Sequence, residues 1–398
     1  MKKLVTVLLI FCFAIPVFTQ SFNKQLNNEL ELIAKEGSIK GFGVAIFSKD
    51  TLFYNKGFGL ASNKGDKKYT TRTRQKIASI SKLLLGVSMV KAQELGLLEM
   101  DDSVNDYLPF SLVNPHFPDE IITIRHLASH TSGLAKIPKY DLKGLYAPTK
   151  IPKIKKEMPF GIRKWFFNKT IKSINSNEEH LLEDFVSNIY STDGKWYSKK
   201  HFRKVQPGVQ TEYSNSGASL LALIIESASG VPYQDFVKLH ITNPLQLKNS
   251  KFDFEESSTM NEPSDYYHAD ITIPSDYRLL LYPAGGYEST IEDFSIFIQT
   301  IAANLHGGNN FLSKESIDEM LTPQFNTEHG ILWEVYDDGN IGHRGDILGA
   351  TSFAYYDTKK DLGYILFCNT AGTKSLDNET YEIRNLLKNY LDTSPSHE

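Results

Sequence analysis

The stretch KIASISKLLLGVSMVKAQELGLL, from Lys76 to Leu98, decides how this sequence is interpreted. It contains Ser79 and, three positions later, Lys82, a spacing that places both side chains on one side of a helix. Such a pair can act as a nucleophile and its base. The pattern S-x-x-K occurs three times in the chain, however, because it recurs at Ser21 and Ser88. We therefore choose among the three serines by the position that each has in its predicted element.

The helix pattern favours Ser79. After the polar run TTRTRQK, apolar residues recur at helical spacing from Ile80 to Leu95. Ser79 thus falls in the first turn, where unpaired N–H groups and the positive end of the helix dipole can stabilise an oxyanion. Ser88 lies more than two turns further in, where backbone groups are already paired. Lys82 can serve as a base only where burial or another cation destabilises its ammonium form.

Residues 1–20 have the pattern of a secretory signal peptide, in which a basic start precedes an apolar run over residues 4–18. An uncleaved anchor is the alternative. Cleavage would remove Cys12 and leave Cys368 as the only cysteine, so that no internal disulfide could form. Ser21 falls at the processing point and is set aside. We expect a periplasmic or secreted protein of bacterial origin.

The composition indicates a globular protein with a large core. The chain has 398 residues, of which 41% are hydrophobic and 23% charged, and a net charge of -4. Residues 21–398 are long enough for one large domain or two intimate ones. The slightly acidic balance gives no reason to expect a nucleic-acid partner.

The pattern of elements predicts an α+β fold. Apolar strand patterns form a hairpin at each end of the chain, at 44–54 and 351–368, and helical patterns lie between them. We therefore expect one antiparallel sheet built from both termini, over about 22–75 and 285–398. A helical subdomain, over about 76–284, would be inserted into it. The active site would lie at the interface of the two.

Local signals place several helices. One is predicted to follow Tyr213-Ser214-Asn215 and to end at Gly230. Pro232 is predicted to open the next helix. Ser289 and Glu292 have capping-box spacing at the start of another, and a final helix is expected over about 379–391.

A basic segment over about 137–204 stands apart from the rest. Between residues 136 and 204 there are 16 Lys or Arg against 7 Asp or Glu. The simplest interpretation is a solvated surface insertion. A lid over a cleft, or a patch that contacts a membrane surface or an anionic polymer, is the alternative.

Two further motifs follow the first in a fixed order. Tyr213-x-Asn215 lies at a loop edge before a predicted helix, and His343-x-Gly345 lies directly before a predicted strand. With S-x-x-K, Y-x-N and H-x-G in this order, the chain resembles the serine β-lactamase family of class C type, with its related DD-peptidases and β-lactamase-like esterases. The resemblance extends over about residues 25–390 and includes the connecting segments ITIRHLASHTSGL (121–134), PGVQTEYSNSGASLLALIIESASG (207–230) and PAGGYESTIEDF (283–294).

The resemblance implies a role for each residue of the first two motifs. Ser79 would be acylated, and Lys82 would hold and relay its proton. Tyr213 would act with Lys82 as general base and then protonate the leaving group, its phenol being biased towards phenolate by the neighbouring cation. Asn215 would orient Lys82 and hydrogen-bond the substrate amide.

The third motif would complete the binding site. By the same resemblance, His343 would lie beside Tyr213 and help to bind a substrate carboxylate or carbonyl. Gly345 would leave room for the substrate along the strand. The backbone N–H of Asp346 would form an oxyanion hole together with that of Ser79.

The chain departs from the family pattern in two places. His-Arg-Gly replaces Lys-Thr-Gly, which removes a permanent charge and a hydroxyl and favours a peptidase or esterase over an efficient β-lactamase. Arg344 could supply a charge. Successive side chains on a strand point to opposite faces, however, so Arg344 should point away from the face on which its neighbour His343 lies. The interval from Ser79 to Tyr213 is also longer than the family pattern, and the excess coincides with the basic segment.

Other chemistries find little support in the sequence. No G-x-S-x-G occurs, which argues against the α/β-hydrolase elbow. His126 and His130 have the spacing for a metal site if both lie on one helix, but they lack the H-E-x-x-H pattern, so we expect no metal. Gly285-Gly286 and Gly307-Gly308 are interpreted as turns.

These observations predict an exported serine hydrolase that acts through an acyl-enzyme on Ser79. Its substrates would be small molecules or peptides with amide or ester bonds: D-alanyl peptides, small esters and, behind these, β-lactams. No cofactor is implied. The alternative is a penicillin-binding sensor or recognition protein that acylates without efficient turnover. The oligomeric state is left open.

Overall fold

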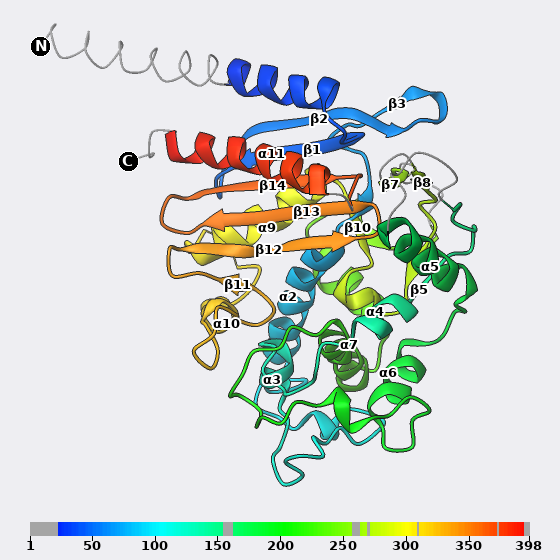
Figure 1. Cartoon of the computed structure of the whole chain (residues 1–398). Coiled ribbons are helices and arrows are strands. Elements are labelled where there is room, and N and C mark those ends of the chain that lie inside the picture. The colour runs from blue at the N-terminus through cyan, green and yellow to red at the C-terminus, as the bar shows by residue number, and fades with distance from the viewer. Residues whose placement is uncertain are drawn as a thin grey trace, which may run out of the picture.

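A seven-stranded antiparallel sheet joins the two ends of the chain (Figure 1). The structure is a computed structural model that describes residues 23–153, 162–256, 263–268, 271–308, 310–371 and 374–393. The order of strands across the sheet is β11 (Glu334–Val335), β12 (Asn340–Ile347), β13 (Ala350–Asp357), β14 (Leu362–Cys368), β1 (Gly41–Phe47), β2 (Leu52–Ser62) and β3 (Lys67–Lys68). Because β1 pairs with β14, the sheet combines both termini, and the predicted α+β fold is confirmed. The expected signal segment and Ser21 lie outside the described residues.

Both faces of the sheet are covered, which explains the nearly continuous apolar strands. On β1, Phe42 and Val44 belong to a core shared with a helix over residues 23–36 and with α11 (Lys374–Thr393). Ala45 and Phe47 alternate with them and belong to the main core, which also contains α9 (Ile291–Leu305). Figure 1 shows α11 on one side of the sheet and α9 on the other. The two-residue period of the strands thus sorts their side chains between two cores.

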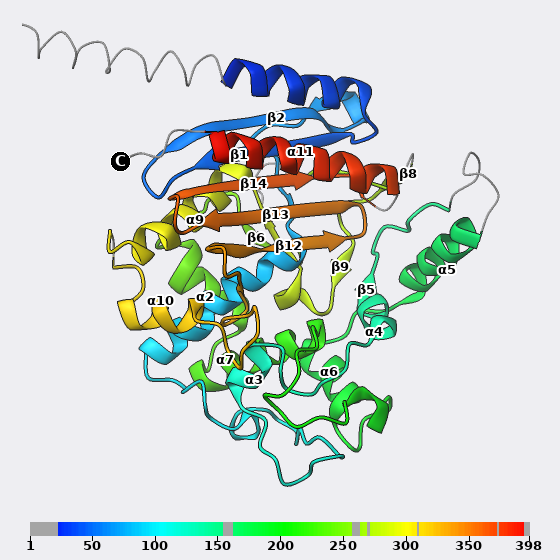
Figure 2. The ribbon, with the colours of Figure 1, turned by 60° about the vertical axis from the view of Figure 1, so that its left-hand side comes forward.

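The remaining helices lie on the α9 side of the sheet, as two views show (Figures 1 and 2). They are α2 (Ser81–Glu94), α3 (Ile124–Ala128), α4 (Pro138–Lys143), α5 (Ile162–Ser176), α6 (Leu182–Tyr190), α7 (Asn215–Ser229), α8 (Tyr233–Val237) and α10 (Lys314–Leu321). Short turns of helix are η1 (Lys64–Asp66), η2 (Ala78–Ile80), η3 (Val104–Asp106), η4 (Lys199–His201), η5 (Lys238–Thr242) and η6 (Tyr282–Ala284). Short strands complete the fold: β4 (Gln75–Lys76), β5 (Leu145–Tyr146), β6 (Lys251–Phe252), β7 (Tyr266–His268), β8 (Ile271–Ile273), β9 (Arg278–Leu279) and β10 (Tyr287–Ser289).

Helix α2 is the central element of the helical region. All its residues from Ser81 to Val90 are buried, so the expected one-sided apolar stripe is wrong for this helix. It runs from the sheet into the helical region, with α7 and α10 packed against it. A helix that is covered on every side is apolar all round, because no face meets water.

Helix α7 follows the expected signals, whereas three other helix starts are shifted: Pro232 is the N-cap of α8 and not its first residue, α11 begins at Lys374 and not at about 379, and α9 is shifted by one residue. The Ser214 side chain accepts a hydrogen bond from the Gly217 N–H at the start of α7, and Gly230 ends that helix with φ 73°. Helix α9 starts one residue later than its predicted capping box. Thr290, rather than Ser289, is the N-cap, and its side chain accepts from the Asp293 N–H. Two hydroxyl residues in a row made the register ambiguous in the sequence.

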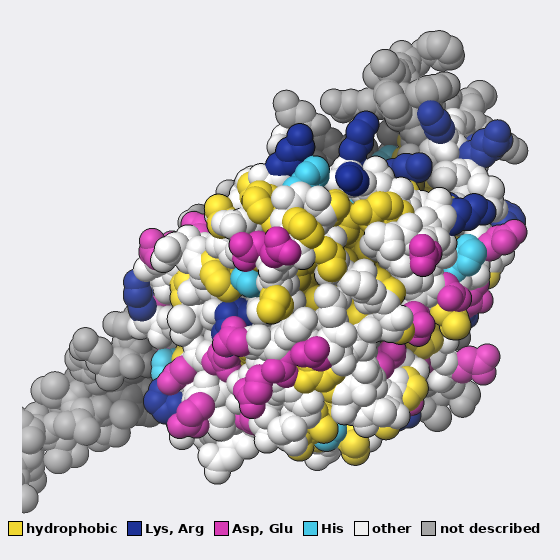
Figure 3. Space-filling model, turned by 90° about the horizontal axis from the view of Figure 1, so that it is seen from below, with side chains coloured by type: hydrophobic (Ala, Val, Ile, Leu, Met, Phe, Trp, Pro, Cys, Tyr) yellow, Lys and Arg dark blue, Asp and Glu magenta, His cyan; other side chains and the backbone are white. Residues whose placement is uncertain are grey.

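The basic segment is more than a solvated insertion. Its α6 buries Phe185, Val186 and Ile189 in the main core, and its β5 pairs with β9. Exposed lysines lie on its outer side, among them Lys195 and Lys199. On the lower face of the molecule, Lys and Arg side chains gather along one edge while Asp and Glu spread over the remainder (Figure 3). One side of the segment is therefore structural, and the other carries charge.

Strand β12 passes unusually close to the chain at Ser79. A Cβ atom on Gly345 would lie 2.5 Å from Ser352 Oγ, 2.6 Å from the Ile77 carbonyl oxygen and 2.8 Å from the Ser79 amide nitrogen. Two of these three atoms belong to backbone, which cannot yield as a flexible side chain does. Gly345 is thus needed for close packing of β12 on η2, rather than for the substrate space that the sequence suggested.

We predict that Gly345→Ala separates β12 from η2. Overpacking of this kind costs about 1–3 kcal/mol, and the displaced Ser79 should acylate more slowly. Thermal unfolding and the rate of fluorophosphonate labelling measure the two effects. Gly65→Ala is the control, since nothing lies within 4 Å of its Cβ position. It should lower stability through its φ of 72° and leave labelling unchanged. Wild-type labelling by Gly345→Ala would contradict this account of the glycine.

Candidate active site

Ser79 lies where the chain turns from the sheet into α2. It is the middle residue of η2, and only Ile80 separates it from the first residue of α2, Ser81. The preceding residue, Ala78, has φ 51°, a left-handed conformation that is uncommon for a residue with a Cβ. Hydrogen bonds hold Ile77 on both sides: its N–H donates to Tyr287 O (2.9 Å) and its carbonyl accepts from Ser352 Oγ (2.6 Å). The surrounding strands thus impose the turn that presents Ser79.

Three polar groups from distant parts of the chain meet at Ser79. Its Oγ lies 3.3 Å from Lys82 Nζ and accepts a hydrogen bond from the Tyr213 hydroxyl at 2.9 Å. Lys82 comes from the first turn of α2, and Tyr213 from the loop that leads into α7. The structure therefore brings together the three residues that the motifs singled out.

The environment of Lys82 favours an uncharged amine. Its side chain is fully buried, and burial lowers the pKa of its ammonium to about 7. Lys82 Nζ donates to Asn215 Oδ1 (2.8 Å) and to the Ala284 carbonyl (2.7 Å). A neutral amine has two hydrogens, and these two acceptors use both. In the charged form the third hydrogen is donated to Ser79 Oγ; when that proton is lost, the lone pair faces Ser79 Oγ, which is the arrangement a general base needs.

Tyr213 is held as a neutral phenol. Burial raises its pKa, and its ring lies between the rings of His130 (centroids 4.6 Å apart) and His343 (6.0 Å). Lys82 Nζ is 4.9 Å from the ring centroid. The expected bias towards phenolate is thus reversed, because burial disfavours the charged forms of both groups. A neutral phenol that donates to Ser79 is suited to carry a proton to a leaving group.

His343 is buried away from the cavity at Ser79. Burial lowers its pKa to about 4, so the ring is neutral at pH 7. One ring nitrogen lies beside the Arg344 carbonyl, and the other is 3.9 Å from Glu334 Oε1. His343 does lie beside Tyr213, as the motif implied. It offers no charge to a substrate carboxylate.

Arg344 points to the opposite face of the sheet, as its place on β12 predicted. Its guanidinium lies over the rings of Phe353 and Tyr381 and pairs with Asp346 at 2.8 Å. Tyr381 belongs to α11, on the far side of the sheet from Ser79. Arg344 therefore does not replace the lysine charge of the K-T-G motif.

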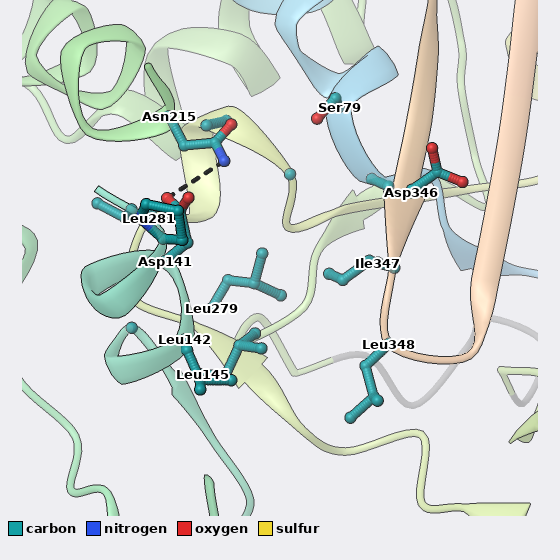
Figure 4. A pocket seen from close by; sticks show the side chains of 15 residues that line it. Ser79, Asp141, Leu142, Leu145, Asn215, Leu279, Leu281, Asp346, Ile347 and Leu348 are labelled. Carbon is teal, nitrogen blue, oxygen red and sulfur yellow. Dashed lines mark hydrogen bonds between the residues drawn. The ribbon is translucent and has the colours of Figure 1, made fainter. Parts of the chain in front are cut away.

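A cavity of about 310 Å³ opens beside Ser79 (Figure 4). Asn215 and Asp346 line it, and the part of the Asp346 N–H in an oxyanion hole stays a prediction. Most of the wall is apolar and comes from α4, β9 and the end of β12; it includes Leu142, Leu145, Leu279, Leu281, Ile347 and Leu348. Because α4 and β5 belong to the basic segment, that segment forms one wall of the cavity.

Sequence reasoning missed one cavity residue, Asp141 on α4. Its Oδ1 accepts a hydrogen bond from Asn215 Nδ2 at 3.3 Å, which Figure 4 shows as a dashed line. Burial raises the pKa of its carboxyl. The only signal in the sequence is an acidic residue in a strongly basic segment.

The rejected candidates have structural roles. The Ser88 hydroxyl donates to the Leu84 carbonyl inside α2 (2.8 Å). His126 caps α3 through Thr123, but His130 lies beyond the end of that helix with φ 59°, so the supposed shared helix face is wrong. Within the described ranges, no group of three or more His, Cys, Asp or Glu is arranged to hold a metal ion. Cys368 is buried and free.

Comparisons with known proteins agree with this geometry. The chain is 22% identical over 358 residues to Protein flp of Staphylococcus aureus (strain MW2), an alignment that covers 88% of this chain and 64% of flp. The chain thus spans less than two thirds of that relative's length.

Solved structures share the fold. The octameric penicillin-binding protein homologue from Pyrococcus abyssi has a TM-score of 0.72 at 22% identity, over 93% of this chain and 78% of the other. A beta-lactamase/D-alanine carboxypeptidase from Yersinia pestis, complexed with citrate, has a TM-score of 0.63 at 19% identity, over 94% and 99%. The family model described as Beta-lactamase matches residues 26–388, nearly the whole described chain. With a buried lysine and a tyrosine on one serine hydroxyl, this chain belongs to the beta-lactamase family.

Proposed function

We propose that this protein is an exported hydrolase that cleaves amide or ester bonds through an acyl-enzyme on Ser79. The observation that carries the proposal is the buried Lys82 amine, whose Nζ lies 3.3 Å from Ser79 Oγ and is hydrogen-bonded to Asn215 Oδ1 and the Ala284 carbonyl, and whose pKa burial lowers to about 7. A serine hydroxyl is a weak nucleophile until a neighbouring base takes its proton. Burial of Lys82 supplies such a base at neutral pH.

The proposed reaction has two halves. Lys82 takes the Ser79 proton while Oγ attacks the substrate carbonyl, and the backbone N–H groups of Ser79 and Asp346 receive the oxyanion. The leaving group departs with a proton from the Tyr213 hydroxyl, and Lys82 returns a proton to Tyr213. Water then attacks the acyl-enzyme by the reverse sequence of proton transfers, which frees the acid and restores Ser79.

The walls of the cavity favour small esters that carry no carboxylate. β12 offers no cation for a substrate carboxylate, because Arg344 is engaged on the α11 face and His343 is neutral. The cavity offers mostly apolar side chains instead. A D-alanyl peptide with a free carboxyl end and a β-lactam both carry a carboxylate, so this feature of β12 favours small esters over either. The Yersinia pestis neighbour, named as a beta-lactamase/D-alanine carboxypeptidase, supports keeping both of these substrates among the candidates.

We predict that Ser79→Ala abolishes covalent labelling by a fluorophosphonate or a fluorescent penicillin, since the nucleophilic oxygen is lost. The fold should survive, with little change in thermal unfolding. Ser88→Ala is the matched control, because it disrupts another S-x-x-K pair and should label like the wild type. Undiminished labelling of Ser79→Ala would refute the assignment of the nucleophile.

We predict that kcat/KM rises about tenfold per pH unit below about pH 7 and is level above it, as expected for one essential base. The sign follows from Lys82, whose ammonium form is inactive and loses its proton as the pH rises. Because burial raises the pKa of Tyr213, no decline is expected until strongly alkaline pH. Initial rates on p-nitrophenyl butyrate, with circular dichroism at each pH, give the profile. A limb centred near the ordinary lysine pKa of about 10.4 would contradict a buried base.

The runner-up function is a penicillin-binding sensor that acylates and does not turn over. Nitrocefin, a D-Ala-D-Ala peptide and p-nitrophenyl butyrate, each followed past one equivalent of enzyme, separate the two. A burst of one equivalent without further product would identify the sensor. Sustained hydrolysis of any of the three would identify the enzyme.

Export and surface contact are part of the proposal. The apolar segment at 4–18 supports a signal peptide, and no helix within the described residues is both long and apolar enough to span a membrane. Cell fractionation tests the location.

Exposed lysines of the basic segment, such as Lys195 and Lys199, support contact with an anionic polymer or membrane surface. Equal sedimentation with anionic and neutral vesicles would argue against the membrane contact.

A further inference from the structure

A carboxylate lies one amide group away from the proposed general base. Asp141 accepts a hydrogen bond from Asn215 Nδ2 at 3.3 Å (Figure 4), and Asn215 Oδ1 accepts one from Lys82 Nζ at 2.8 Å. The three side chains come from α4, α7 and α2, which are far apart in the sequence. The proton transfers proposed above use Lys82 and assign no part to Asp141.

The two hydrogen bonds fix the direction in which the Asn215 amide faces. An amide side chain has an acceptor on one side and donors on the other, and a turn about its last bond exchanges them. The ammonium of Lys82 can only donate, and the ionised carboxyl of Asp141 can only accept. One orientation therefore satisfies both neighbours, with Oδ1 towards Lys82. Without an acceptor at Asp141, the amide could turn and present its donors to Lys82.

Asp141 also brings a negative charge close to the Lys82 amine. Burial lowers the pKa of Lys82, whereas the charges of Asp141 and Glu334 act to raise it. Burial raises the pKa of the Asp141 carboxyl. The hydrogen bond from Asn215 and the positive charges of Lys82 and Lys136 favour its ionised form. The carboxylate and the base thus stabilise each other's charged forms against the effect of burial.

We propose that Asp141 is a positioning residue for the general base: it holds the Asn215 amide with Oδ1 towards Lys82, and its charge stabilises the ammonium form of Lys82. The inference rests on the proposed function, in which Lys82 is the base, and adds a residue that sets the pH range of the reaction. Because α4 belongs to the basic segment, the segment that forms one wall of the cavity would also tune the base.

Several elements bring titratable groups close to Lys82. The groups that touch it or act on its charge are Ser79 on η2, Tyr213 before α7, His130 after α3, His343 on β12, Glu334 on β11 and Asp141 on α4. Burial lowers the pKa of both histidines and raises that of the tyrosine, so these three are neutral at pH 7. The carboxylate of Glu334 accepts from the hydroxyls of Tyr336 and Tyr355. Among these groups, Asp141 is therefore the acid that is joined to Lys82 through a hydrogen-bonded side chain.

The competing explanation is that Asp141 is only part of the cavity wall. Besides Lys82, the charged or titratable groups that act on it or feel its charge are Lys136, Tyr190 on α6 and Tyr213. A wall residue could face Lys136 for stability alone. Loss of its charge would then change folding stability or access to the cavity, but not the pH at which Lys82 loses its proton. The pH dependence of the reaction separates the two explanations.

The test measures how fast a fluorophosphonate labels Ser79 in the full-length protein from about pH 5 to about pH 9. Labelling needs the nucleophile and its base, and does not depend on which substrate is the natural one. Asp141→Asn removes the charge and keeps an acceptor for Asn215, whereas Asp141→Leu removes both. Glu183→Gln is the control, because it makes a matching charge change on the exposed side of α6. Circular dichroism and thermal unfolding at each pH monitor the fold.

We expect the wild-type labelling rate to rise through about pH 7. In Asp141→Asn this limb should move by about 0.5–1 pH unit towards acid, because one partly screened charge near the amine is lost. At about pH 6 the variant should then be about three- to fivefold faster than the wild type, each relative to its own plateau. Damage to the fold would not produce such a gain.

The other two variants separate charge from orientation. Asp141→Leu should show the same acid shift and, in addition, a plateau lower by about tenfold, since the Asn215 amide is free to turn and Lys82 loses a well-placed acceptor. Glu183→Gln should keep the wild-type limb.

Four outcomes would overturn the inference. An unshifted limb in both Asp141 variants, or a shift towards alkaline pH, refutes it and leaves the proposed function standing. An equal shift in Glu183→Gln refutes it as well, because the effect would then belong to net charge. A wild-type plateau in Asp141→Leu refutes the orientation of Asn215 by Asp141. A wild type that is not labelled, or whose labelling does not change with pH, overturns the proposed nucleophile or base and the inference with it.

Discussion

The burial of one lysine amine is the constraint on which the site depends. Lys82 lies in the first turn of a helix that is covered on every side, and its charged form would have to exist with little water around it. Two carbonyl oxygens accept its hydrogens, which satisfies the neutral amine. The same burial that makes the ammonium unfavourable makes the amine a base at neutral pH. The residues around α2 therefore have to exclude water from Lys82 both for a well-packed core and for a basic amine.

The sheet places the nucleophile against this base. The left-handed turn at Ala78 is sustained by hydrogen bonds from two different strands to Ile77, and Gly345 lets β12 approach the Ser79 amide. A strained backbone conformation of this kind persists only where several surrounding contacts hold it in place. The interface between sheet and helices supplies that rigidity, because both share one core.

The basic segment forms part of the cavity beside Ser79. Residues from its first helix and strand form one wall, and α6 anchors the segment in the core. The wall brings apolar side chains and a carboxylate to a place where β12 provides no cation. The H-R-G motif thus leaves β12 without a cation towards the cavity, since Arg344 lies on the α11 face, while the basic segment contributes both Asp141 and Lys136, whose Nζ is 5.9 Å from the Tyr213 ring centroid.

By itself, the sequence determined the α+β fold, the family and the choice of Ser79 among three similar serines. These conclusions depend on local information: the two-residue period of the strands, the start of an apolar helix, and motifs in a fixed order. The tertiary structure alone decided the protonation of Lys82 and Tyr213, the position of His130 beyond its helix, the burial of His343 and the entry of Asp141 into the cavity. Each of these depends on which groups surround a side chain, and the partners of Lys82 lie 133 and 202 positions away. A sequence pattern does not show how far a side chain is removed from water. This desolvation is what shifts the pKa values of Lys82, Tyr213 and His343.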